Sequence, residues 1–381
     1  MNGSWLARGI EPADLRHDGN SFTIQRWVLA SSVMISHAWD MTNPVAGLDP
    51  IATVLGFPVS RLAVYLFFTL SGFLVTGSLY KRGVGPFLLA RALRLLPGLW
   101  VMLIVVPLGL WAAFGTLSFG AFASSPETWR FVGRNALLLG RDFTLPGLFE
   151  THYLRGAVNG SLWTIPKELQ CYLLLALAAA LGLTQPRRRV TILLALLLLL
   201  ELALPTGLRL GSMPLGATRQ LAFAFGLGVL AWLWRDRLPL SWPLALGLVA
   251  LALLVPAEAR WKVNASQIAF GYLAIVAGFR VPASVKRFSA AAPDYSYGIY
   301  IYAFPMQQAA VALGAVTPLA NLGLAFVMTL PFAALSWHLV EKPALRLKPG
   351  VRPAAPVMAG LAPPENAPAE SAPLPVPRFD P

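Results

Sequence analysis

The chain alternates long apolar runs with short polar segments. Ten runs of roughly 20 residues can each cross a ~30 Å hydrocarbon core as a helix. They cover residues 22–41, 58–79, 95–118, 161–182, 190–207, 216–235, 239–256, 265–282, 293–314 and 318–340. The pattern predicts an all-α integral membrane protein with about ten transmembrane helices. Because ten is even, both chain ends are expected on the same side.

Composition supports this interpretation. Hydrophobic residues make up 56% of the chain and charged residues only 12%, about half the charged share of soluble domains. A water-soluble globular protein is therefore excluded. The first run follows a polar lead, residues 1–21, and contains Arg26 and His37, so it does not have the pattern of a cleavable signal peptide. The single cysteine, Cys171, leaves no basis for a disulfide framework. We expect no metal site either.

The net charge of +13 follows the membrane topology. With the N-terminus in the cytoplasm, eleven Lys and Arg residues fall in short inner loops. Only Arg209, Arg260 and Lys262 fall in short outer loops. Since inner loops carry the positive excess in membrane proteins, we predict an N-in, C-in orientation. The basic excess is thereby explained without a nucleic-acid partner.

Two segments differ from the short-loop pattern. A long outer loop, residues 119–160, follows the third run, and its middle, residues 129–139, is amphipathic. We expect it to form a structured cap, with a loose loop as the alternative. The tail, residues 346–381, is rich in Pro and Ala and is predicted to be disordered and cytoplasmic. Residues 22–345 then form the membrane domain.

Ionisable residues inside apolar runs are candidates for function because burying charge in a membrane is costly. Arg26 and His37 are eleven residues apart in the first run, about three helical turns, so they share one face with ~16 Å between them. The alternative is that Arg26 reaches lipid phosphate and His37 anchors at the interface.

Glu168 enters the membrane from the outer side, at a depth similar to that of His37. A carboxylate beside an imidazole suits general-base chemistry, because it fixes the tautomer and stabilises the charged form. The alternative is a structural ion-pair network with Lys167, Asp40 and Arg61, which lie at comparable depth.

Near the inner side, Arg91 and Arg94 are expected on one face of a short helix, where two guanidinium groups suit phosphate recognition. The alternative is that they only mark the inner side. Ser71 and Gly72 favour close helix packing. We expect Glu341 to lie at the interface, where Pro343 ends the last helix.

These residues together resemble a family of bacterial integral-membrane acyltransferases, acyltransferase family three. The family includes O-acetylating enzymes of lipopolysaccharide O-antigen, exopolysaccharide and Nod factor. The five matches follow the family's order: Arg26 with ten residues before His37; residues 67–74, Phe-Phe-Thr-Leu-Ser-Gly-Phe-Leu; Arg91 and Arg94 before a proline; residues 161–168, beginning Ser-Leu-Trp and ending at Glu168; and residues 296–305, beginning Ser-Tyr and ending in a proline.

The resemblance implies an enzyme of ten or eleven helices in the bacterial inner membrane. Such enzymes take an acyl group from cytoplasmic acyl-CoA, usually acetyl-CoA, and deliver it to a hydroxyl of a glycan or small molecule. It also implies roles for the matching residues: His37 as base or transient acyl carrier, Arg26 as its partner, Glu168 as the acidic residue, and Arg91 and Arg94 as ligands of the CoA phosphates. Tyr300 and Tyr302 lie deeper than an interfacial aromatic belt requires, so we expect them, with Trp163, to bind a polar substrate; the alternative is that they are interfacial aromatics. The sequence departs from the family at Pro166, Lys167 and Ala303; many members carry His at the last position.

The leading hypothesis is therefore O-acyl transfer from acyl-CoA to a cell-envelope or secreted acceptor. The main alternative is a transporter or flippase that moves a glycolipid or small solute without covalent chemistry. A third alternative is an inactive relative that acts as a scaffold.

Overall fold

The computed structural model describes residues 9–43, 49–139, 142–204, 209–210, 213–214 and 216–349 of the chain. Most of the predicted disordered tail, residues 350–381, lies outside the described residues, as do residues 1–8 of the polar lead. The rest of the lead is described and ends in a short 3-10 turn, η1 (His17–Gly19).

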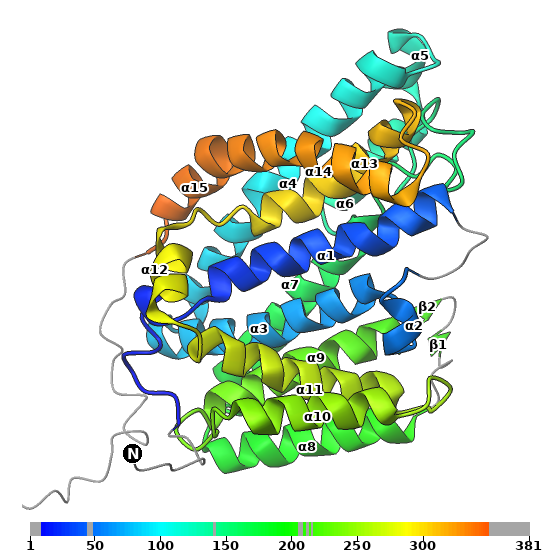
Figure 1. Ribbon diagram of the computed structural model, residues 1–381. Coiled ribbons are helices and arrows are strands. Elements are labelled where there is room, and N and C mark those ends of the chain that lie inside the picture. The colour runs from blue at the N-terminus through cyan, green and yellow to red at the C-terminus, as the bar shows by residue number, and fades with distance from the viewer. Residues whose placement is uncertain are drawn as a thin grey trace, which may run out of the picture.

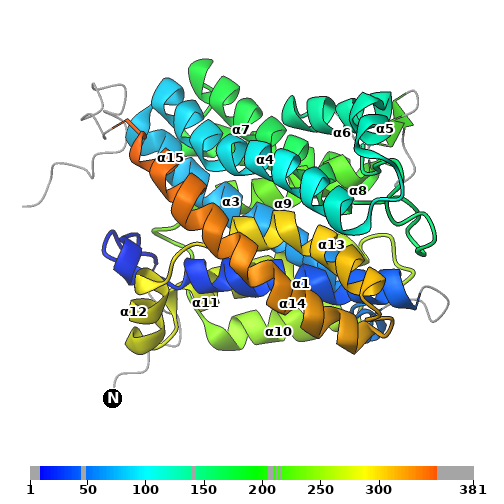
Figure 2. The same cartoon turned by 90° about the horizontal axis from the view of Figure 1, so that it is seen from above.

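Each of the ten predicted runs coincides with a helix. These helices are α1 (Phe22–Thr42), α3 (Val59–Arg82), α4 (Val84–Phe114), α7 (Ile165–Ala180), α8 (Arg187–Ala203), α9 (Gly216–Leu233), α10 (Trp242–Leu254), α11 (Lys262–Phe279), α13 (Ser296–Ala312) and α14 (Pro318–Leu335). Figure 1 shows α1, α3, α9, α11, α10 and α8 running roughly parallel, one below another, while Figure 2 shows α4 and α14 crossing the same stack at an angle. The chain is a helical bundle.

Shorter elements complete the fold. They are α2 (Ala52–Leu55), α5 (Phe119–Ser124), α6 (Pro126–Ala136), η2 (Gly160–Thr164), α12 (Ala283–Ala291), η3 (Ser336–Glu341) and α15 (Lys342–Arg346). Two short strands, β1 (Arg209–Leu210) and β2 (Met213–Pro214), pair antiparallel. The start of α1 and the end of α15 lie on the same side of the bundle (Figure 1).

By length and composition alone, three helical segments can each cross a membrane: Val59–Arg82, Val84–Phe114 and Pro318–Arg346. A fourth is added if α11 and α12, which meet at 90°, count as one broken span. The described helices therefore make a multi-pass membrane protein. The number of ten crossings and the N-in orientation stay predictions.

Helix α4 begins at Val84, well before the predicted run at residue 95. Arg91 and Arg94 thus lie inside this long helix and not on a separate short one. The chain turns from α3 into α4 at Gly83, whose φ of +77° is readily adopted only by glycine. Pro97 lies inside α4 without ending it, as membrane helices tolerate.

Close packing of α3 on α9 depends on two glycines. A Cβ at Gly72 would lie 2.2 Å from the Phe225 carbonyl oxygen, and one at Gly228 only 2.0 Å from the Thr69 oxygen. Real Cβ atoms cannot approach backbone so closely, so both positions require glycine. The prediction that Gly72 permits close helix approach is confirmed.

The outer segment is structured where it is described. Ser118 and Ser125 cap α5 and α6 with side-chain hydrogen bonds. Helix α6 begins three residues before the predicted amphipathic stretch. Further along, buried Gln308 of α13 donates hydrogen bonds to the Leu154 and Ala157 carbonyls. The segment is therefore fixed to the bundle, as expected for a cap.

Candidate active site

The bundle encloses a cavity of about 320 Å³. Its walls come from α1, α3, α4, α7 and α13, and the segment after α15 closes it on one side. Four cationic side chains line it: Arg26, Arg91, Arg94 and Lys348. Much of the remaining wall is apolar. The cavity is thus amphiphilic, with its cations gathered near the ends of the helices that the topology assigns to the cytoplasmic side.

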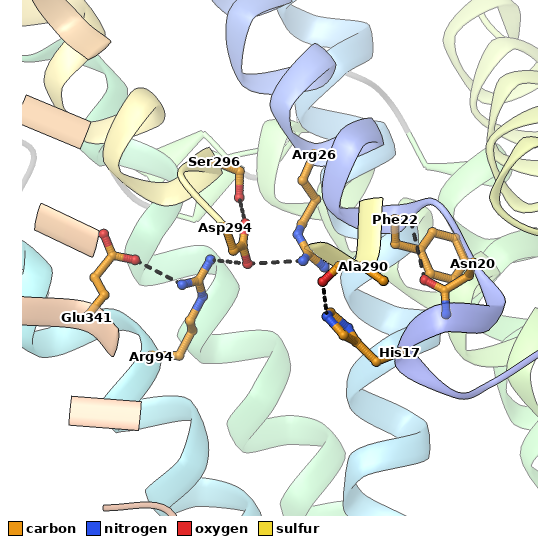
Figure 3. A network of polar contacts seen from close by, with 9 residues as sticks. All are labelled: His17, Asn20, Phe22, Arg26, Arg94, Ala290, Asp294, Ser296 and Glu341. Atoms are coloured by element: carbon orange, nitrogen blue, oxygen red, sulfur yellow. Dashed lines mark hydrogen bonds and ion pairs between the residues drawn. The ribbon is translucent and has the colours of Figure 1, made fainter. Parts of the chain in front are cut away.

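Two of these arginines belong to a chain of ion pairs (Figure 3). Arg26 Nη2 lies 3.0 Å from Asp294 Oδ2, and Arg94 Nη2 lies 2.7 Å from the same oxygen. Arg94 Nη1 lies 2.9 Å from Glu341 Oε2. Ser296 donates to the other Asp294 oxygen at 2.6 Å. Two guanidinium groups and two carboxylates balance one another, so the network holds Arg26 and Arg94 in fixed positions.

Glu341 was predicted to lie at the interface, but it is buried inside the bundle, with only 1% of the residue exposed. Pro343 does not end the helix either. The chain passes through the π-helical turn η3 and continues in α15. This turn points Glu341 inward, where Ser336 Oγ donates to it at 2.9 Å.

Sequence reasoning missed the roles of Asp294 and Glu341. A signal was available, since Asp294 stands two residues before the Ser-Tyr motif and Glu341 is an acidic residue at the end of an apolar run. What the sequence cannot show is that both side chains meet the same arginine.

Arg91 and Arg26 keep unused hydrogen-bonding capacity. The Nε atom of each is buried and has no hydrogen-bond partner among the residues that the structure describes. The Arg91 guanidinium lies over the rings of Phe87 and Tyr172, 6.0 and 5.9 Å from their centroids. Buried donors without partners are costly. The Arg91 guanidinium, which lines the cavity and has no ion pair among the described residues, therefore favours an anionic ligand there.

Lys348 adds a titratable cation to the same space. It lies beyond the last helix, and burial together with the nearby Arg91, Arg94 and Arg82 guanidinium groups lowers its pKa to about 8. Such crowding of like charges indicates that a negative ligand would be stabilised here.

Glu168 lines the cavity, as do its two partners. Its carboxylate accepts hydrogen bonds from the Tyr172 hydroxyl and from Ser71 Oγ, the latter at 3.3 Å. Ser71 and Tyr172 also bond to each other at 2.9 Å. Ser71 of the Phe-Phe-Thr-Leu-Ser-Gly motif thus orients Glu168. It also precedes Gly72, which allows α3 to pack closely on α9.

Tyr300 lines the end of the cavity that the predicted topology places toward the outer side. Its hydroxyl lies 2.7 Å from Thr164 Oγ1 and donates to the Ser161 carbonyl at 3.2 Å, while its ring contacts Phe67. The Ser-Leu-Trp motif is thereby fastened to α13. Trp163 is partly buried against the core, and Tyr302 stacks on Phe332 at 5.5 Å. Neither belongs to the described lining of this cavity.

His37 lies just beyond that end. Its ring is 5.2 Å from that of Phe304, which stands four residues after Tyr300 on α13, a rise of ~6 Å. Its Nδ1 lies 3.5 Å from Asp40 Oδ2, and 22% of its side chain is exposed. His37 and Glu168 were expected to pair because of their similar depth. In the structure His37 contacts Asp40 and Phe304, whereas Glu168 contacts Tyr172 and Ser71. His37 does not belong to the described lining of the cavity.

The fold and the cavity define a multi-pass helical membrane protein that can hold an amphiphilic anion beside acidic and phenolic groups. The family model described as acyltransferase domain, acyltransferase family three, matches residues 20–338. The chain belongs to this family and is an acyltransferase.

Two relatives extend over almost the whole match. An O-acetyl transferase of Shigella phage Sf6 is 27% identical over 343 residues, covering 86% of this chain and 96% of that protein. Nodulation protein 10 of Rhizobium leguminosarum bv. viciae is 28% identical over 353 residues, covering 86% and 94%. No solved structure matches the chain.

Proposed function

We propose that the protein is an O-acetyltransferase of the bacterial inner membrane, which moves an acetyl group from cytoplasmic acetyl-CoA to a hydroxyl of a cell-envelope or secreted glycan. The observation that carries the proposal is the cavity: its cations gather at one end, and Tyr300 at its other end is one helical turn from Phe304, whose ring lies 5.2 Å from that of His37. The names of the two relatives favour acetyl as the group and a hydroxyl oxygen as its acceptor.

The donor fits the cavity by chemistry. The CoA phosphates would be held by Arg91 and Lys348, with the free Nε of Arg26 as a further donor. The apolar wall formed by Phe68, Leu74 and their neighbours would cover the uncharged arm that carries the thioester. A charged head and an uncharged arm match a lining that has cations on one side and mostly apolar residues elsewhere.

At the outer end, His37 carries the proton transfer. Asp40 lies beside Nδ1 and favours the tautomer protonated there, so Nε2 is left as the base. Nε2 takes the proton of the acceptor hydroxyl, whose oxygen attacks the thioester carbonyl carbon, and the carbon–sulfur bond breaks to release CoA. In a two-step variant, His37 is itself acetylated first and then gives the group to the acceptor.

The thioester has to pass Tyr300 to reach His37. The hydrogen bond between the Tyr300 and Thr164 hydroxyl groups and the contact of Tyr300 with Phe67 lie between the cavity and His37. We assign to this contact the role of a barrier that the acyl-bearing arm displaces. A closed barrier in the absence of donor would protect the cytoplasm from leakage through the bundle.

The first prediction tests His37. In liposomes with radiolabelled acetyl-CoA and envelope polysaccharide extracted from the source cells, His37→Ala should lower the rate of label transfer by about 10²- to 10⁴-fold, the loss typical for a positioned base. The control is His17→Ala, because His17 is exposed in the polar lead.

Near-normal transfer by a well-expressed His37→Ala protein would refute the mechanism. Transport of a glycolipid across the liposome membrane without transfer of label would instead support the transporter alternative.

A further inference from the structure

A second cavity, of about 260 Å³, opens at the end of the bundle where α8 runs into β1. Its described lining consists of Glu201, Leu202, Gln220, Arg260, Trp261 and Asn264, which come from the end of α8, the start of α9 and the start of α11. In Figure 1 this end of the bundle is also the end at which α1 finishes, and His37 lies on the last turns of α1. The proposed topology makes it the outer face. We call it the outer cavity.

The walls of the outer cavity are held by polar contacts between helices. Arg219 Nε lies 2.5 Å from Glu201 Oε2, which joins α9 to α8. Tyr65 of α3 donates to Gln220 Oε1 at 2.5 Å. Gln267 Nε2 of α11 donates to the Gln220 carbonyl at 2.9 Å. Polar contacts thus join α3, α8, α9 and α11 beside this cavity, and polar groups inside a membrane protein are costly unless they serve a function.

One amide group of the lining has an unused donor. Only 6% of Asn264 is exposed, and its Nδ2 has no hydrogen-bond partner within the described part of the chain. A ligand hydroxyl group can accept from such a donor.

The mouth of the cavity adds an aromatic surface. Trp261 is 54% exposed next to Arg260, whose guanidinium donates to the Leu204 carbonyl and is held in place. An exposed indole offers an apolar, electron-rich face, while Glu201, Gln220 and Asn264 offer polar atoms behind it. A ring with an apolar C–H face and hydroxyl groups on its edge satisfies both surfaces. The volume lies just below the ~300–1,000 Å³ of ordinary ligand pockets, which suits one such ring.

We propose that the outer cavity binds a sugar ring, with Trp261 stacking on its face and Asn264 and Glu201 bonding its hydroxyl groups. Binding of a sugar in this cavity does not depend on the proposed function. Only the assignment of that sugar to the acceptor glycan rests on it. The site would hold a unit of the glycan remote from the hydroxyl that is acetylated at His37.

Saturation-transfer NMR on the detergent-solubilised full chain tests this without any acyl donor. The probes are the methyl glycosides of glucose, galactose, rhamnose and N-acetylglucosamine, and glycerol phosphate as a lipid-headgroup probe. We expect at least one glycoside to bind, and Trp261→Ala or Asn264→Leu to weaken it up to about tenfold, the scale of one hydrogen bond or stacking face. Trp129 on α6 is also more than half exposed, and Trp129→Ala should bind the glycoside as the unchanged protein does.

Several outcomes overturn the proposal: no glycoside binds the unchanged protein, the two substitutions leave binding unaltered, or glycerol phosphate alone binds. If Asn264→Leu does not fold, Trp261→Ala still decides, because an indole more than half exposed is not needed for packing. His37→Ala should keep full sugar binding. Failure of acetyl transfer with intact sugar binding would therefore refute the proposed function and leave this site standing.

Discussion

At the scale of single residues, the four cations of the main cavity do not have equal roles. Arg94 contacts Asp294 and Glu341, whereas the Arg91 guanidinium lies against aromatic rings with its Nε unpartnered among the described residues. Arg94 is therefore a structural member of a balanced network. Arg91 is the cation most available to an anionic donor.

This difference gives the second prediction. Arg91→Ala should raise the Kd for acetyl-CoA at least tenfold, because hydrogen bonds to charged groups contribute about 1.5–3 kcal/mol, while the protein stays folded. Arg94→Ala should instead destabilise the protein by about 3–5 kcal/mol, since it leaves two buried carboxylates without that partner. Calorimetric titration with acetyl-CoA and thermal unfolding in detergent separate the two effects. Equal acetyl-CoA affinity of Arg91→Ala and the unchanged protein would reject its phosphate role.

Lys348 gives the third prediction, which concerns pH. With its pKa lowered to about 8, Lys348 is protonated at pH 7 and loses its charge as the pH rises through that value. Because the lost charge is positive and the donor is an anion, the Kd for acetyl-CoA should rise between pH 7 and 9.5. Acetyl-CoA is the suitable probe, since its blocked thiol does not titrate. In Lys348→Gln the affinity should be weaker at pH 7 and nearly flat over this range; an unchanged pH profile would exclude Lys348.

At the scale of helices, the packing of α3 on α9 positions much of the site. Ser71 and Gly72 are neighbours on α3, so the residue that orients Glu168 is adjacent to the residue that lets α9 approach. A shift of α3 away from α9 would therefore move Ser71 and alter the cavity. The packing of α3 on α9 and the position of Glu168 in the cavity therefore depend on the same turn of α3.

The fourth prediction tests this packing. Gly228→Ala should destabilise the protein by about 1–3 kcal/mol, the usual cost of overpacking, because its Cβ would meet the Thr69 carbonyl oxygen at 2.0 Å. Gly109→Ala on α4 is the matched control: nothing lies within 4 Å of its Cβ position, and alanine is the better helix former. Thermal unfolding in detergent should show a lower Tm for the first and an equal or higher Tm for the second. The reverse order would contradict the close α3–α9 contact.

At the scale of the whole molecule, the two cavities lie toward opposite ends of one bundle. The cationic cavity faces the end where α15 finishes, and the outer cavity opens where α8 runs into β1. An acyl donor and a glycan acceptor could thus be held on opposite sides of the membrane, with His37 near the second side. The orientation of the bundle in the membrane decides whether this assignment is right.

The fifth prediction tests orientation. Cys171, the single native cysteine, is buried, so an introduced cysteine can be labelled with little background. On intact cells, an impermeant maleimide should label Ser124→Cys in α5 but not Ser284→Cys in α12, because the positive charges around α12 predict a cytoplasmic location. After permeabilisation both should react. Labelling of Ser284→Cys alone on intact cells would reverse the topology.

The sequence by itself determined the helices and the motif residues of this protein. Apolar length and charge in the loops are local properties, so the ten helical segments could be predicted to within a few residues, apart from the early start of α4. The motifs likewise identified Arg26, His37, Arg91, Arg94 and Glu168 before any geometry was known, since each stands at a recognisable spacing.

Only the tertiary structure decided which of these side chains meet. The rotation of each helix about its axis depends on packing against several neighbours at once, and no local pattern records it. For this reason Arg94 contacts Asp294 and Glu341, Glu168 contacts Tyr172, and His37 contacts Phe304. The outer cavity was hidden for the same reason, because its lining comes from α8, α9 and the start of α11, and the pattern of each segment does not record how they pack around one space.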